Sequence, residues 1–226
     1  MLDCPEVQEI YILPGCFKYA NISWITAITT LKRLVIDERC FVKSNEVDGE
    51  GICSLADWKS IEEIEIRYRC FMYYKSLEWS NMDNLKKISF GNQCFKNCEA
   101  FELSNLKSLP SIEIGDCCIT NLSTFLLDDL PKLEHVTIGS GDCYLNSITF
   151  YDSCCRIVNC PSLRQLTIGD YRFKNCKVFE LSNLESLQKL TIGRDCFTDS
   201  DFTLRSMYIE EIVGMIGYLV DKTNHD

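Results

Sequence analysis

The chain has 226 residues, a formal net charge of −10 at pH 7 and 46% hydrophobic residues, enough for one domain with a substantial core. The acidic balance disfavours nucleic acid and anionic membrane surfaces as partners, because both repel negative charge. The longest run of apolar, Gly or Tyr residues, Ile212 to Val220, is shorter than the ~20 residues of a membrane-spanning helix. The N-terminus also lacks the basic and apolar regions of a signal peptide, so neither membrane insertion nor a signal sequence is expected.

One apolar phrase recurs along the chain: an apolar residue, two variable residues, an apolar residue, one variable residue and a third apolar residue. Its eight copies start at Val7, Leu31, Ile61, Leu85, Leu109, Leu133, Leu163 and Leu187. The offsets between successive starts are 24, 30, 24, 24, 24, 30 and 24 residues. Such regularity predicts a repeat architecture, in which each unit buries its apolar face against its neighbours.

Residues around the phrase repeat as well. The last apolar residue is followed by Gly in five successive copies, namely Gly91, Gly115, Gly139, Gly169 and Gly193. A Cys followed by Phe, as in Cys94 and Phe95, comes shortly after this position, and a Phe-x-Leu-x-x-Leu segment such as Phe101 to Leu106 precedes the next phrase. Alternation places the last two apolar residues of the phrase on one side of a strand. The glycine is expected to turn the chain sharply, and the Phe-x-Leu segment to be extended on the opposite wall of each coil.

Two units carry six extra residues, and both ends of the chain depart from the repeat. The extra residues lie within Val42 to Ile52 and within Tyr144 to Ser153, where they are either specific contact loops or tolerated surface insertions. The chain starts halfway through a repeat, which favours further repeats N-terminal to it. Helical spacing of apolar residues over 208–221 predicts a short C-terminal capping helix. A degenerate ninth strand starting at Ile209 is the alternative.

The segments Phe101 to Leu109 and Phe179 to Leu187 resemble leucine-rich repeats. More narrowly, Ile12 to Phe17 and Ile192 to Phe197 resemble the BspA-type repeats of microbial surface proteins, in which a small residue precedes Phe. The resemblance implies a right-handed leucine-rich-repeat solenoid of stacked parallel β-strands with little helix, a role in recognition and no catalytic residues. Residues 1–226 would form a single domain of about eight repeats. The chain departs from the family in having Cys where Ala is usual, and Gly where an asparagine ladder is expected.

The fifteen cysteines invite a metal or disulfide interpretation, but eleven of them align with core columns of the repeat, as small buried hydrophobes do. The sequence contains no Cys-x-x-Cys pair, and its only histidines are His135 and His225, so no metal site is expected. Neither a nucleophile beside a base nor a phosphate-binding glycine loop is present, which predicts no enzyme activity and no cofactor. Reduced thiols in a cytoplasmic setting are favoured, with the cell surface as the alternative if the chain is part of a larger protein.

The variable positions of the phrase predict a polar face on the stacked strands. This candidate protein-binding face comprises Tyr11, Lys32, Arg33, Glu62, Glu63, Glu65, Lys86, Lys87, Glu113, Glu134, His135, Arg164 and Lys189. Charge signs alternate over the second to fourth copies, and cross-strand pairs of opposite charge contribute roughly 0.2–1 kcal/mol each. These residues therefore either bind another protein or merely keep the sheet soluble and in register. The sequence predicts a non-catalytic protein–protein interaction module that uses this face and the two insertions. The alternative is a structural spacer or adhesin-like part of a larger surface protein.

Overall fold

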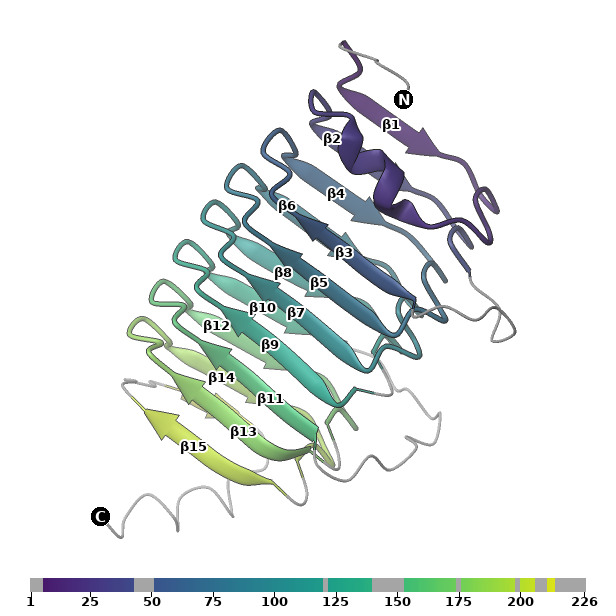
Figure 1. Ribbon diagram of the computed structural model, residues 1–226. Helices are drawn as coiled ribbons and strands as arrows, with labels where there is room; N and C mark the ends of the chain where they lie inside the picture. The colour runs from purple at the N-terminus through teal and green to yellow at the C-terminus, as the bar shows by residue number, and fades with distance from the viewer. Residues whose placement is uncertain are drawn as a thin grey trace, which may run out of the picture.

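A computed structural model describes residues 6–42, 51–119, 122–139, 153–173, 176–197, 200–205 and 211–213. The chain winds into a parallel β-solenoid whose coils each place strands on two opposite walls (Figure 1). One wall is a nine-stranded sheet with the order β1-β2-β4-β6-β8-β10-β12-β14-β16, called the long sheet below. The other is a seven-stranded sheet with the order β15-β13-β11-β9-β7-β5-β3, called the short sheet. The predicted solenoid of stacked parallel strands is confirmed.

The strands of the long sheet coincide with the recurring phrase. They are β1 (Glu9–Ile12), β2 (Arg33–Ile36), β4 (Glu63–Ile66), β6 (Lys87–Phe90), β8 (Ser111–Ile114), β10 (His135–Ile138), β12 (Gln165–Ile168), β14 (Lys189–Ile192) and β16 (Glu211–Val213). Six of the strands of the short sheet follow the Phe-x-Leu segments or their equivalents, and β15 continues the series. They are β3 (Ile52–Ala56), β5 (Ser76–Ser80), β7 (Ala100–Ser104), β9 (Thr124–Asp128), β11 (Ser153–Val158), β13 (Cys176–Ser182) and β15 (Asp201–Arg205).

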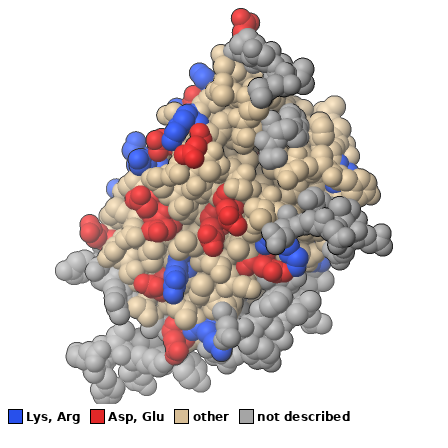
Figure 2. Space-filling model, in the orientation of Figure 1, with Lys and Arg blue, Asp and Glu red and all other residues tan. Residues whose placement is uncertain are grey.

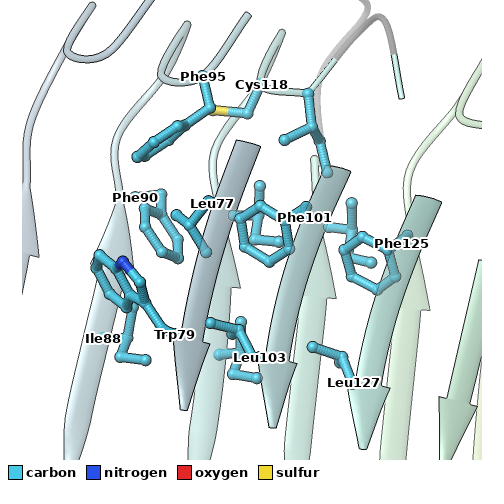
Figure 3. Close-up of a cluster of buried hydrophobic side chains, with 14 of the residues drawn as sticks. Leu77, Trp79, Ile88, Phe90, Phe95, Phe101, Leu103, Cys118, Phe125 and Leu127 are labelled. Carbon is cyan, nitrogen blue, oxygen red and sulfur yellow. The ribbon is translucent and has the colours of Figure 1, made fainter. Parts of the chain in front are cut away.

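The core fills the space between the two sheets. In β8, Ile112 and Ile114 are buried while Ser111 and Glu113 face outward, because side chains alternate along a strand. Figure 3 shows Leu77, Phe101 and Phe125 of the short sheet pointing inward beside Phe90 of the long sheet. The apolar pattern of the sequence is thus satisfied only when one coil stacks on the next.

Register is conserved from coil to coil, so equal residues stack on one another. Phe101 pairs with Phe125 in the strand register, and their rings stack with centroids 5.4 Å apart. In the turn after the long sheet, the Phe71 and Phe95 rings stack at 4.8 Å with 1° between their planes. These ladders of like residues extend the core along the axis of the solenoid.

Turn geometry differs from the sequence prediction at the glycines. Among the five repeated glycines, all of which are described, only Gly139 has a positive φ, of 49°. A Cβ atom on Gly115 would instead lie 2.8 Å from the backbone nitrogen of Asn92. These glycines are needed because successive coils approach closely, whereas the left-handed positions are occupied by larger residues such as Phe95, with φ 50°.

An asparagine ladder is present after all, at the corner that follows the short sheet. This column has positive φ and consists of Asp57, Asn81, Asn105, Asp129, Asn159 and Asn183. The Nδ2 atom of Asn105 donates to Oδ1 of Asn81 at 2.5 Å, and that of Asn183 donates to Oδ1 of Asn159 at 2.7 Å. The expectation that the ladder is absent was wrong because only the glycine turn was considered. Asn and Asp tolerate left-handed backbone better than other side chains do.

The ends of the solenoid also depart from the repeat. A 3₁₀ helix, η1 (Ile22–Ala27), takes the place of a short-sheet strand in the first coil. Glu211–Val213 form strand β16, which pairs parallel with β14, so the predicted capping helix is wrong for these residues and the ninth-strand alternative is correct. The rest of 208–221 lies outside the described residues, as do 43–50 and 140–152, which hold most of the two insertions. Among the described residues, no helix is long and apolar enough to cross a membrane.

Candidate functional site

The structure places all thirteen predicted face residues along the outer side of the long sheet. Five immediately precede a strand, namely Lys32, Glu62, Lys86, Glu134 and Arg164. Five begin a strand, namely Arg33, Glu63, Lys87, His135 and Lys189. Three occupy the next outward position, namely Tyr11, Glu65 and Glu113. All thirteen side chains are exposed or half-buried, so the repeat brings them together as one surface.

Ion pairs between coils neutralise the N-terminal half of this face. Glu62 lies 2.7 Å from the Lys86 ammonium and 3.8 Å from that of Lys32. The hydrogen bond from Lys86, its charge and that of Lys32 hold the pKa of Glu62 below its usual range. The Arg33 guanidinium lies 3.2 Å from Glu63 and 3.8 Å from Glu65. The sign alternation in the sequence therefore corresponds to cross-strand pairing.

Arg67 joins this network although the sequence did not single it out. Its Nε donates to Glu65 at 2.8 Å, and its NH1 donates to Asp37 at 3.1 Å. Arg67 occupies the column in which later coils carry Gly91 and Gly115. A charged residue at a position otherwise held by glycine was a signal available in the sequence.

The face changes character towards the C-terminal half. Lys87, Glu113 and Arg164 form no ion pair or side-chain hydrogen bond within the described part of the chain, and all three are exposed. Threonine hydroxyls replace carboxylates in the outward column, where Thr137 and Thr191 both align with Thr167. Only Glu134 and His135 approach each other, at 4.0 Å. This half of the face presents side chains that are not already engaged within the chain.

A hollow of about 510 Å³ lies where the two halves meet, at the C-terminal ends of β4, β6, β8 and β10. Its lining residues are Glu65, Ile66, Arg67, Tyr68, Ser89, Phe90, Gly91, Asn92, Glu113, Ile114, Gly115 and Thr137. Two of the predicted face residues, Glu65 and Glu113, thus line it, whereas the other eleven do not. Pockets of this size commonly accommodate ligand groups.

The cysteines form a second ladder inside the turn after the long sheet. Cys94 Sγ donates to the carbonyl oxygen of Arg67 at 2.7 Å, and Cys118 Sγ donates to that of Gly91 at 3.1 Å. The same contact to the preceding coil is made by Cys40, Cys70 and Cys196. A thiol in this position satisfies a backbone carbonyl that the alanine usual in the family would leave without a donor.

Other cysteines are also buried, with two exceptions that bear on the redox state. Burial raises the pKa of Cys53 and of Cys98 to about 12. Cys16, in contrast, is exposed, and Cys117 is disulfide-bonded, so the expectation of uniformly reduced thiols was wrong at that position. Within the described residues, no group of three metal-ligating side chains comes together.

Arg172 interrupts the cysteine ladder. It is buried, and burial lowers its pKa. Its NH1 donates to the Cys118 carbonyl at 3.4 Å, while Nε and NH2 have no hydrogen-bond partner among the described residues. The side chain spans from its own coil back to that of Cys118, past Gly139, where a Cβ atom would collide with the guanidinium. Its position is explained by this packing.

The outer face of the short sheet is different in charge. Figure 2 shows this face, where acidic and basic side chains form small separate groups among uncharged residues. Glu78 and Glu102 are direct neighbours in the strand register. Partial burial and the charge of Glu78 raise the pKa of Glu102. Like charges in this arrangement destabilise a sheet, so this face lacks the ionic matching found on the long sheet.

Comparison with known proteins gives one result. The BspA type Leucine rich repeat region family matches residues 64–203 in six copies. No curated protein and no solved structure matches the chain. Family members are generally non-catalytic repeat scaffolds. Since the match extends over more than half of the 226 residues, this chain belongs to the BspA-type leucine-rich repeat family.

Proposed function

We propose that this chain is a non-catalytic protein-interaction module that binds another protein through the outer face of the long sheet. The observation that carries the proposal is the division of that face. Its N-terminal half is neutralised by ion pairs within the chain, whereas Lys87, Glu113 and Arg164 are exposed without such pairs among the described residues. Exposed charges steer association and discriminate between partners.

The solenoid supports this role by its shape. Stacked coils form an extended surface whose side chains are held at regular spacing, and such surfaces suit recognition of other proteins. Strand register keeps the outward columns aligned from β1 to β16. Binding to this surface therefore requires little reorganisation of the backbone, which lowers its entropic cost.

A structural spacer is the second candidate, and the ion pairs of the N-terminal half favour it. A surface that pairs its charges internally needs no partner to account for them. Exposed pairs of this kind stabilise only weakly, by about 0–1 kcal/mol each. The two candidates differ in whether substitutions in the C-terminal half of the face alter binding.

Affinity capture from a lysate of the source cells tests the proposal. The variant Lys87→Glu/Arg164→Glu reverses two unpaired charges on the long sheet, and Lys107→Glu/Lys177→Glu makes the same change in net charge elsewhere. We expect one protein to be retained by the native chain and by the second variant, and lost by the first. Equal recovery by all three chains, or recovery of nothing, would favour the spacer. Circular dichroism checks that each variant is folded.

A further inference from the structure

The hollow on the long sheet arises from the identity of a few small residues. Ser89 and Thr137 provide short side chains in the outward column, and Gly91 and Gly115 provide none at the strand ends. In the preceding coil the equivalent positions hold Glu65 and Arg67, which close the hollow on that side. The depression is therefore built into rigid, hydrogen-bonded sheet: Gly91 donates its amide to Ile66 at 2.7 Å, and Gly115 donates to Phe90 at 2.8 Å.

The charges around the hollow leave one carboxylate unsatisfied. Glu65 accepts from Arg67 at 2.8 Å, and Arg67 also contacts Asp37 at 3.1 Å. Glu113 lies two strands from Glu65, with Ser89 between them in the register. Glu113 is exposed and has no hydrogen-bonding or ionic partner among the described residues. The lining therefore combines a neutralised wall with one free negative charge.

We infer that the hollow receives the side chain of an arginine presented by the partner protein. This inference rests on the proposed interaction role of the long sheet. A guanidinium carries five N–H donors in one plane and binds a carboxylate through two parallel hydrogen bonds. Glu113 would take that pair, while the hydroxyls of Ser89 and Thr137 would accept the remaining donors. The glycine backbones leave room for the aliphatic part of the side chain.

An ammonium group fits the lining less well than a guanidinium. Lysine has three donors around one point, and it is more strongly hydrated. The acceptors of the hollow come from adjacent strands, about 4.8 Å apart, a spacing that a planar, branched group spans better than a single nitrogen. Arginine is also enriched at the centres of protein interfaces.

Amide chemical shifts of the ¹⁵N-labelled full chain test the inference with N-acetyl-arginine amide as the probe. We expect shifts at Ser89, Gly91, Glu113 and Gly115 that saturate with a dissociation constant of a few millimolar, as suits one side chain on an open surface. N-acetyl-citrulline amide, which has nearly the same shape without the charge, should produce no saturating shift. N-acetyl-lysine amide should bind at least about threefold more weakly than the arginine probe.

Two variants complete the test. Glu113→Gln removes the free charge at an exposed position and should weaken the arginine probe at least about fivefold, because hydrogen bonds to a charged acceptor are roughly twice as strong as neutral ones. Glu102→Gln, on the short sheet, should leave the affinity unchanged. The inference is overturned by absent shifts, by equal responses to citrulline or lysine, or by an unchanged affinity in Glu113→Gln.

The capture experiment and this titration can fail independently. A partner lost by the Lys87→Glu/Arg164→Glu variant, together with no binding of the arginine probe, would leave the interaction face standing and reject the arginine site. Saturating shifts in the hollow without a captured partner would support the site and reject the broader face.

Discussion

Individual cysteine side chains do structural work in this solenoid. Each ladder thiol donates to a carbonyl of the preceding coil, as Cys94 does to Arg67 at 2.7 Å. Cys53 and Cys98 lie in the core without solvent contact. A neutral thiol packs like a small apolar side chain, whereas a thiolate in the same place is costly. Their protonation is therefore coupled to folding.

Stability is expected to fall in alkaline solution. The pKa values of Cys53, Cys98 and Cys160 are raised by burial from about 9 to about 12 in the folded chain. Below pH ~9 these thiols are protonated in both states and their contribution is fully present. Above it, the unfolded chain releases protons that the folded chain retains, which costs about 1.4 kcal/mol per pH unit for each thiol. Urea unfolding between pH 8 and 10, under reducing conditions, measures this loss.

The Cys98→Ala variant provides the control for that measurement. With one buried thiol removed, the fall in unfolding free energy with pH should be less steep. An unfolding free energy that stays constant from pH 8 to pH 10 in the native chain would show that these thiols do not titrate on unfolding. Cys16, which is exposed, should react with iodoacetamide in the folded protein long before Cys53 or Cys98.

A single added methyl group distinguishes the two reasons for glycine. Gly115→Ala places a Cβ 2.8 Å from the backbone of the preceding coil, and should lower the free energy of unfolding by about 1–3 kcal/mol. Gly15→Ala meets no atom within 4 Å but must adopt φ of +71°, so it should cost only about 1 kcal/mol. Urea midpoints compare the two variants. A larger loss for Gly15→Ala would mean that backbone conformation, not coil spacing, selects glycine.

At the scale of elements, the asparagine ladder has a gap that suggests a stabilising change. Asn105 receives no hydrogen bond at Oδ1, and the residue at its level in the next coil is Asp129, which has no side-chain donor at neutral pH. Both residues have positive φ, 52° for Asn105 and 55° for Asp129. An asparagine at position 129 could continue the ladder without altering the backbone.

Asp129→Asn should therefore raise the free energy of unfolding by about 0.5–1.5 kcal/mol, the usual net contribution of a hydrogen bond. Thermal or urea unfolding of the variant gives the value directly. Asp195→Asn makes the same chemical change at another exposed position of positive φ, 53°, outside this ladder, and should have little effect. Equal stabilisation by both variants would assign the gain to reduced negative charge instead.

Strands were predictable from the sequence because alternation and repeat spacing act together. Ile112 and Ile114 point inward for the same reason that Phe101 and Leu103 do, and both patterns are visible in one copy. The turns were less predictable, since glycine signals either positive φ or close packing, and only the neighbouring coil decides between them. Glu211–Val213 became a strand because the edge of β14 offers hydrogen-bonding groups, which outweigh a short helical periodicity.

At the scale of the whole molecule, each coil contacts only its neighbours, so stability is distributed along the axis. Trp24, Trp58 and Trp79 are the only tryptophans in the sequence, and all lie in its first third. Tryptophan fluorescence therefore reports the N-terminal coils, whereas far-ultraviolet circular dichroism reports the whole stack. The two signals can be compared in one denaturation experiment.

Leu181→Ala should separate these signals. Leu181 is fully buried in β13, and its truncation should cost about 2–5 kcal/mol in the coils around it. We expect the midpoint by circular dichroism to fall further than the midpoint by tryptophan fluorescence. Leu55→Ala, in β3, should shift the fluorescence midpoint at least as much as the other. Coincident transitions in both variants would show that the stack unfolds as one cooperative unit.

The candidate site was predicted as a surface but not as a pocket. Variable positions of the repeat place every candidate residue on the long sheet, since strand alternation leaves them no other side. The hollow depends instead on what is missing at Gly91 and Gly115, and on Arg67 neutralising Glu65. Such absences and pairings involve three coils at once, and a residue-by-residue reading of the sequence does not combine them.

Identical register in both sheets makes one coil interchangeable with the next. Ile88 aligns with Ile112 in the long sheet, and Phe101 aligns with Phe125 in the short sheet, both offset by 24 residues. Removing or duplicating 24 residues at this point would join equivalent positions and preserve each ladder, whereas a change of any other length would move core side chains to the surface. Genes for such chains can therefore grow or shrink in whole coils, and the face gains or loses one row each time.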